Sequence, residues 1–142
     1  LIALGDALKR RRDQISQGLG ITTQQWLIML YLAKDPNLPF FESEQHDKKI
    51  LAAEITRALN VSRPNVTNLI ATLLDKGLAV QIEDTEDRRR KRLALSPEGV
   101  KLLESLQPMR KMLNEQLFED LSTDERQVFL ALIETCLRRL SA

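Results

Sequence analysis

The run that decides the fold of this 142-residue chain is Leu59-Asn60-Val61-Ser62-Arg63-Pro64-Asn65. Apolar residues precede it at helical spacing and predict a helix from about Ile50 to Leu59. Asn60 can take the left-handed conformation that ends a helix, and Ser62 is a residue type that caps the next one. Because only a few residues separate the two helices, they must cross steeply, as in a helix-turn-helix.

The second helix of this pair has an apolar face and a polar face. Arginine can contact guanine through two hydrogen bonds, and amides and hydroxyls can also bond to base edges in the major groove. We therefore predict a recognition helix for duplex DNA, although an ordinary solvated helix would also have a polar face. The candidate contacts are Ser62, Arg63, Asn65, Thr67, Asn68, Thr72 and Lys76.

A two-stranded hairpin is predicted next. Gly77 ends the helix, residues 78–83 alternate in strand rhythm, and a return strand follows from Arg92 to Leu95, with Leu93 and Leu95 inward. The loop between the strands carries Asp87, Arg88, Arg89, Arg90 and Lys91. Five basic residues at 88–92 are nearly cancelled by four acidic ones at 83–87, so the order of the charges matters more than their sum. Asp87 can brace an arginine by a bidentate pair, which leaves other guanidiniums for phosphates or a narrow minor groove.

Amphipathic helices flank this central region. A capping box formed by Thr22 and Gln25 opens a largely apolar helix, in which Trp26 is predicted to pack in the core. A cap at Ser96 and a second capping box at residues 122–125 open two further helices. The terminal helices exceed what a small winged domain needs for its own core, and we infer a homodimer. The predicted dimerisation residues are Leu4, Leu8, Phe129, Leu132, Leu137 and Leu140.

Composition limits the other functional classes. The net charge is +1, so affinity for nucleic acid must come from local clusters, and aromatics are too few for a single-strand binder. One cysteine, Cys136, excludes an intrachain disulfide and fits a reducing compartment, and its apolar neighbours suggest a buried, inert thiol. No membrane span or signal pattern is present, which favours the cytoplasm. Because Leu1 falls in mid-helix pattern, we expect residues upstream of it.

Catalysis, cofactors and metals are not predicted. The sequence shows no glycine-rich phosphate loop and no combination of nucleophile, acid and base. Residues 36–49 are predicted to form a loop that contains Glu42, Glu44, His46 and Asp47. One histidine with carboxylates, without a second nitrogen or sulfur ligand, is weak support for a metal site.

Three motifs resemble the MarR family, the multiple-antibiotic-resistance type of bacterial transcriptional regulators. Residues 21–26 are similar to the start of the family's second helix, and Lys76-Gly77-Leu78 is similar to the exit of its recognition helix. The most specific match runs from Asp84 to Arg89 and from Leu93 to Gly99, and it resembles the wing and the entry into the next helix. Asn68 departs from the arginine that the family often has there, and the 36–49 loop is longer than usual.

The resemblance implies a homodimer that binds a palindromic operator and represses, or sometimes activates, transcription. It also implies that Asp87 is the bracing acid and Arg89 the wing-tip arginine. Many relatives bind small aromatic or anionic effectors between the dimerisation helices and the winged domain and then loosen from DNA. In this chain such a pocket would include Trp26, Leu30 and Met109.

We therefore predict a mainly α fold of the α+β class, a winged helix-turn-helix with N- and C-terminal helices forming a dimerisation domain. Residues 21–99 would form the DNA-binding domain, and residues 1–20 and 100–142 the helical dimerisation region, as one continuous structural unit. The predicted function is that of a DNA-binding regulator, not an enzyme. The alternative is an interaction module that uses the winged fold to bind protein and has no DNA function.

Overall fold

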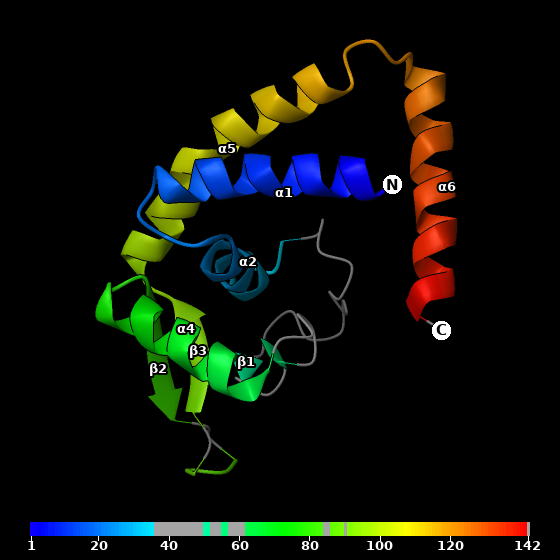
Figure 1. The fold of residues 1–142 in the computed structure, drawn as a ribbon. Helices are drawn as coiled ribbons and strands as arrows, with labels where there is room; N and C mark the ends of the chain where they lie inside the picture. Colours follow the sequence, from blue (N-terminus) through cyan, green and yellow to red (C-terminus); the bar gives the residue numbers. More distant parts are fainter. Residues whose placement is uncertain (36–49, 52–54, 57–61, 84–85, 90, 142) are drawn as a thin grey trace. The chain divides into compact units, whose positions relative to one another are not determined.

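The computed structural model describes residues 1–35, 50–51, 55–56, 62–83, 86–89 and 91–141. It is mostly helical with a small antiparallel sheet, as predicted (Figure 1). The elements are α1 (Ile2–Gln17), α2 (Thr23–Leu32), β1 (Ile50–Leu51), α4 (Arg63–Asp75), β2 (Ala79–Glu83), β3 (Lys91–Leu95), α5 (Pro97–Leu117) and α6 (Thr123–Ser141). The chain divides into two compact units, Leu1–Glu104 and Ser105–Ala142, which we describe separately. Within the described ranges, no helix combines the length and apolar character needed to cross a membrane.

Helix α2 is the centre of the first unit, where it contacts α1, α4 and β3 (Figure 1). Its start is fixed by the predicted capping box: Gln25 N donates to Thr22 Oγ1 at 3.1 Å, and Thr22 N donates to Gln25 Oε1 at 3.0 Å. These two bonds satisfy backbone donors that a helix start otherwise leaves without partners. Trp26 is 4% exposed, and Ile28 and Met29 are fully buried, which confirms that this helix forms the core.

Polar side chains attach α1 to α2. Ser16 is buried, and its hydroxyl lies 3.1 Å from the Thr23 hydroxyl, which also donates to the Asp13 carboxylate. Two glycines follow α1, of which Gly20 has a left-handed φ of +72°, whereas Gly18 remains right-handed. The left-handed Gly20 thus forms part of the short turn that connects α1 to the capping box at the start of α2.

Helix α4 packs through Val66, Ile70 and Leu73, all buried. Ser62 stands at the N-cap with extended backbone, as predicted, but its side chain makes no capping hydrogen bond. Pro64 in the first turn lacks the N–H that a cap would serve, so helix initiation depends less on the serine hydroxyl. The predicted turn residues Asn60 and Val61 lie outside the described residues.

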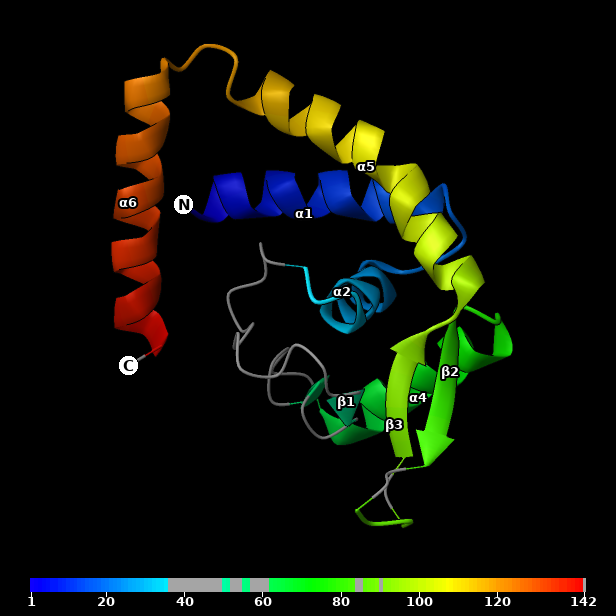
Figure 2. The same cartoon turned by 180° about the vertical axis from the view of Figure 1, so that it is seen from behind.

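The sheet has the strand order β1-β3-β2, with both pairs antiparallel (Figure 2). Ile50 and Leu51 pair with Leu93 and Arg92, so the predicted helix start at Ile50 is wrong. A two-residue strand is too short to show any periodicity, and pairing with β3 decides its conformation. Ile55 and Thr56, further along, are helical, and Ile55 is fully buried as predicted.

Strand β2 buries Ala79 and exposes Val80 and Ile82, the reverse of what residue size suggests. Ala79 pairs with Leu95 and Gln81 with Leu93. Directly opposed residues lie on the same face of an antiparallel sheet, so the register turns Val80 and Ile82 away from Leu93, which is buried as predicted.

The end of α4, the start of β2 and the start of α5 meet at a closely packed junction that is held by hydrogen bonds. Gly77 has a φ of +70°, and its carbonyl accepts a hydrogen bond from the Ser96 hydroxyl. The same hydroxyl accepts from Gly99 N at 3.0 Å, which confirms the predicted cap of α5. A Cβ atom added at Gly99 would lie 2.1 Å from the Leu78 carbonyl oxygen. Only glycine allows this approach of the α5 backbone.

The second unit contains the end of α5, a turn and α6. The Arg126 guanidinium donates to the carbonyls of Phe118 and Leu121, and the predicted capping box joins Ser122 and Glu125 by two bonds of 3.1 Å. The bonds from Ser122 hold the pKa of the exposed Glu125 carboxyl below its ordinary value. This unit therefore fixes the start of α6 through its own side chains.

Helix α6 has an apolar stripe that the described residues of the chain leave exposed. Leu132 is 60% exposed, and Phe129 and Leu137 are also exposed. Cys136 is exposed as well, so the prediction of a buried thiol is wrong for the single chain. The apolar neighbours that suggested burial are themselves uncovered.

We expect Gly99→Ala to lower the free energy of unfolding by about 1–3 kcal/mol, the usual cost of overpacking, because the new methyl group would collide with a backbone carbonyl. Chemical denaturation followed by circular dichroism measures the change. Gly5→Ala is the matched control, since a Cβ at Gly5 meets nothing within 4 Å and alanine favours a helix. Equal stability of the two variants would contradict the importance of the junction.

Candidate nucleic-acid interface

The N-terminal half of α4 presents a polar surface to solvent. Asn65, Thr67 and Asn68 are exposed, and Ser62 before the helix is exposed too. Arg63 opens the helix, but its side chain lies outside the described part of the chain. The structure thus brings most of the predicted recognition-helix residues together on the accessible side of α4.

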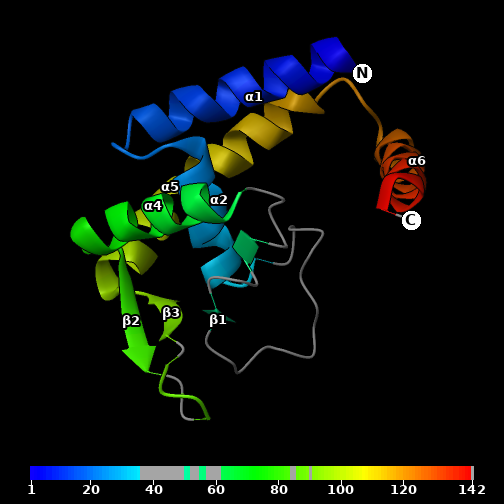
Figure 3. The same cartoon turned by 60° about the horizontal axis from the view of Figure 1, so that its bottom comes forward.

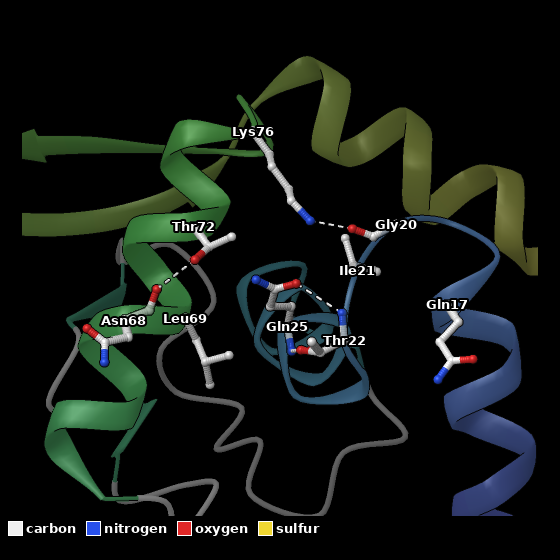
Figure 4. A pocket seen from close by; sticks show the side chains of 9 residues that line it. All are labelled: Gln17, Gly20, Ile21, Thr22, Gln25, Asn68, Leu69, Thr72 and Lys76. Carbon is white, nitrogen blue, oxygen red and sulfur yellow. Dashed lines mark hydrogen bonds between the residues drawn. The ribbon is translucent and has the colours of Figure 1, made fainter.

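Two predicted contacts in the C-terminal half of α4 have other partners. Thr72 is half-buried, and its hydroxyl donates to the Asn68 carbonyl at 3.0 Å. The Lys76 ammonium extends across to the turn after α1 and donates to the Gly20 carbonyl (Figure 4). These side chains are therefore less available for bases than those of the N-terminal half.

The hairpin formed by β2 and β3 extends beyond α4 and carries the wing residues at its tip (Figure 3). Arg89 N donates to Asp87 Oδ1 at 3.0 Å, and Arg89 Nε donates to the same oxygen at 3.3 Å. Asp87 thus braces Arg89 as predicted, but through one carboxylate oxygen and not through a bidentate pair. The side chain of Arg89 is 91% exposed, so its terminal nitrogens face solvent.

The remaining wing residues are also accessible where the structure describes them. Arg88 and Lys91 are exposed, and Arg90 lies outside the described residues. The braced Arg89 combines a fixed backbone attachment with a projecting cation. Such a group can donate hydrogen bonds to a phosphate or enter a narrow minor groove.

The three residues predicted to form an effector pocket occupy different environments. Trp26 and Leu30, on α2, are 4% and 6% exposed in the core of the first unit. Met109, on α5, belongs to the second unit and is 45% exposed. A pocket that includes all three stays a prediction.

A surface cleft of about 520 Å³ lies between the α1–α2 turn and helix α4 (Figure 4). It is lined by Gln17, Gly20, Ile21, Thr22, Gln25, Asn68, Leu69, Thr72 and Lys76. Sequence reasoning missed this cleft, because its two walls are about fifty residues apart in the chain. The capping box marked the start of α2 but did not indicate which element faces it.

No group of three or more histidine, cysteine, aspartate or glutamate side chains that could hold a metal ion occurs among the described residues. The acidic cluster with His46 lies in the 36–49 segment, outside that part of the chain.

Comparisons with known proteins agree with this geometry. The family model described as MarR family matches residues 19–90, more than half of the chain. The HTH-type transcriptional regulator PrsX of Escherichia coli is 28% identical over 123 residues, which are 87% of this chain and 70% of PrsX. The HTH-type transcriptional regulator FarR of Neisseria gonorrhoeae is 30% identical over 106 residues, 75% of this chain and 64% of FarR.

A solved structure of the Staphylococcus aureus MepR–DNA complex is similar over nearly the whole chain. The TM-score is 0.76 at 25% sequence identity, and the match covers 97% of this chain and 91% of MepR. The matched region of the family model contains α2, α4 and β2 and ends just before β3. The chain therefore belongs to the MarR family of winged helix-turn-helix transcriptional regulators.

Proposed function

We propose that this protein is a homodimeric, sequence-specific DNA-binding regulator that represses transcription from a palindromic operator. The observation that carries the proposal is the exposed Arg89, braced by Asp87 on a hairpin beside an exposed polar helix. A protein whose wing and helix enter neighbouring grooves needs these two elements. The similarity to the structure of MepR bound to DNA supports this role.

In this proposal the two DNA-binding elements have different tasks. Asn65, Thr67 and Asn68 on α4 contact base edges in the major groove and supply sequence preference. Arg89 at the wing tip neutralises a phosphate or inserts into the minor groove, with Arg88 and Lys91 nearby. The small net charge of +1 means that these local cations supply the electrostatic attraction.

The second copy is the proposed partner of the exposed apolar residues on the terminal helices. Leu4 is 45% exposed on α1, Leu8 is half-buried, and Leu132 and Leu140 on α6 are 60% and 84% exposed. Exposed apolar stripes of this kind on a helix are typical of protein–protein interfaces. In a dimer, the two recognition helices would contact half-sites about 34 Å apart on one side of the duplex.

We further propose that a small aromatic or anionic effector releases the protein from its operator in the cytoplasm, with Trp26, Leu30 and Met109 contributing to the pocket. The experiment that tests the function is selection of bound duplexes from a random pool, repeated with small aromatic acids present. Recovery of a palindrome supports the proposed regulator. Loss of binding on addition of one compound identifies the effector class.

The alternative function, a winged module that binds protein alone, is tested by titration with random duplex at low salt. DNA-binding regulators retain non-specific affinity, with dissociation constants around 10⁻⁴ to 10⁻⁶ M even at physiological salt. No binding at protein concentrations above this range would favour the protein-binding alternative.

Arg89→Ala should weaken binding to operator and to random duplex alike, because a phosphate contact carries no sequence information. The slope of log K against log salt concentration should decrease in magnitude by about 0.9, the value for one lost phosphate contact. Fluorescence anisotropy over a potassium chloride series measures both quantities. Lys111→Ala, which removes an exposed charge on α5, is the control, and an unchanged slope for Arg89→Ala would exclude the wing assignment.

Asn65→Ala should instead reduce discrimination between operator variants and leave the salt slope unchanged. A bidentate amide–adenine contact contributes about 1–3 kcal/mol of preference for the correct base, and truncation removes both of its hydrogen bonds. Competition binding with single-base operator variants identifies the position that loses its preference. A uniform loss at all positions would indicate that Asn65 does not contact a base.

Leu132→Glu should shift the protein toward monomer, because a carboxylate in an apolar interface lacks a partner. Analytical ultracentrifugation across a dilution series gives the dissociation constant. Gln127→Glu, on the opposite side of α6, introduces the same charge and should leave the dimer intact. If both variants sediment like the wild type, the stripe on α6 is not the dimer interface.

A further inference from the structure

The cleft beside α4 has the chemical character of an anion site. None of the nine described residues that line it is acidic, and its one charged group is the Lys76 ammonium. The start of helix α2 forms one wall, where the helix dipole gives a positive potential. Polar side chains and the apolar Ile21 and Leu69 complete the lining.

Gln25 directs a hydrogen-bond donor into this cleft. The residue is 4% exposed, and its Oε1 atom accepts from Thr22 N at 3.0 Å, which fixes the orientation of the amide. The nitrogen Nε2 therefore points the other way, toward the side of α4 that carries Thr72 (Figure 4). Among the described residues, none accepts a hydrogen bond from this nitrogen. The nitrogen is not enclosed in the core, so this fixed donor in the wall of the cleft can bind a ligand with acceptor oxygens.

Lys76 supplies a second donor at the same place. Its ammonium donates to the carbonyl of Gly20, another residue that lines the cleft, which uses one of its three N–H groups (Figure 4). The remaining donors and the positive charge are available to an anion. Because that carbonyl bond fixes the position of the ammonium, the charge is already in place before any ligand binds.

We propose that this cleft binds a phosphate of the operator's backbone, held by Gln25 Nε2 and Lys76 Nζ beside the recognition helix. This rests on the proposed function, since it assumes that α4 enters the major groove. A helix in the major groove is flanked by the sugar–phosphate backbones, and α4 itself forms one wall of the cleft through Asn68, Leu69 and Thr72. A phosphate held here would fix how deeply and in which register α4 enters the groove.

The test uses Gln25→Glu, which replaces the donor and retains the cap. Glutamate is the usual third helical residue of a capping box, so its carboxylate can still accept from Thr22 N. The other carboxylate oxygen then stands where Nε2 was and repels a phosphate. Gln24→Glu is the matched control, because it adds the same charge in the same helical turn on an exposed residue that does not line the cleft.

Operator affinity is measured for wild type and both variants at one salt concentration, with thermal unfolding as a check of the cap. We expect the dissociation constant of Gln25→Glu to rise about tenfold above that of Gln24→Glu, as for a lost hydrogen bond to a charged group. Equal affinities of the two variants would overturn the proposal. If the wild type itself binds neither operator nor random duplex, the proposed function fails.

Lys76→Gln provides a second test that does not involve the cap. It should lower the magnitude of the salt slope by about 0.9, the value for one phosphate contact, whereas Lys111→Gln should not. Titration with inorganic phosphate, followed by thermal shift, identifies a site for free anions. If phosphate stabilises the wild type but not Gln25→Glu, while both bind operator equally, the cleft binds small anions and the proposal is wrong.

Discussion

The two bonds of the Ser96 hydroxyl are the constraint on which the placement of the DNA-binding elements depends. The hydroxyl donates to the Gly77 carbonyl at the end of α4 and accepts from Gly99 N at the start of α5. The Ser96 backbone N–H also donates to the Leu78 carbonyl at 3.1 Å. Helix α4, the β2–β3 hairpin and the first turn of α5 are therefore joined through Gly77, Leu78, Ser96 and Gly99, and a displacement of any one of them would move the others.

The same joint anchors one end of the β2–β3 hairpin, and the pairing of β1 with β3 supports the hairpin further along. Strand β2 begins immediately after the left-handed Gly77, and β3 ends at the serine that caps α5. Both strands are thus anchored at the end of the hairpin that lies opposite its tip. At the tip, Asp87 restricts Arg89, which limits the conformational entropy that the long arginine side chain would otherwise lose on binding.

The sequence predicted the features whose cause is local. The capping boxes at Thr22 and Ser122, the left-handed Gly77 and the pairing of Asp87 with Arg89 all involve residues close together in the chain. Features decided by distant residues escaped prediction: the pairing of Ile50 with Leu93, the orientation of Val80 and the cleft between Gln25 and Thr72. Periodicity reports how polar each position is, but it does not report which segment lies opposite.

The order of charged residues determines what the wing can do, because the acidic and basic groups of residues 83–92 nearly cancel in number. If the acids alternated with the bases, each cation would have an adjacent anion, and little charge would remain for a phosphate. In this chain, Asp87 uses one oxygen to hold both the backbone and the Nε atom of Arg89, which is 91% exposed. The terminal guanidinium nitrogens stay accessible, so an acid that lowers the net charge of the wing also orients its most prominent cation.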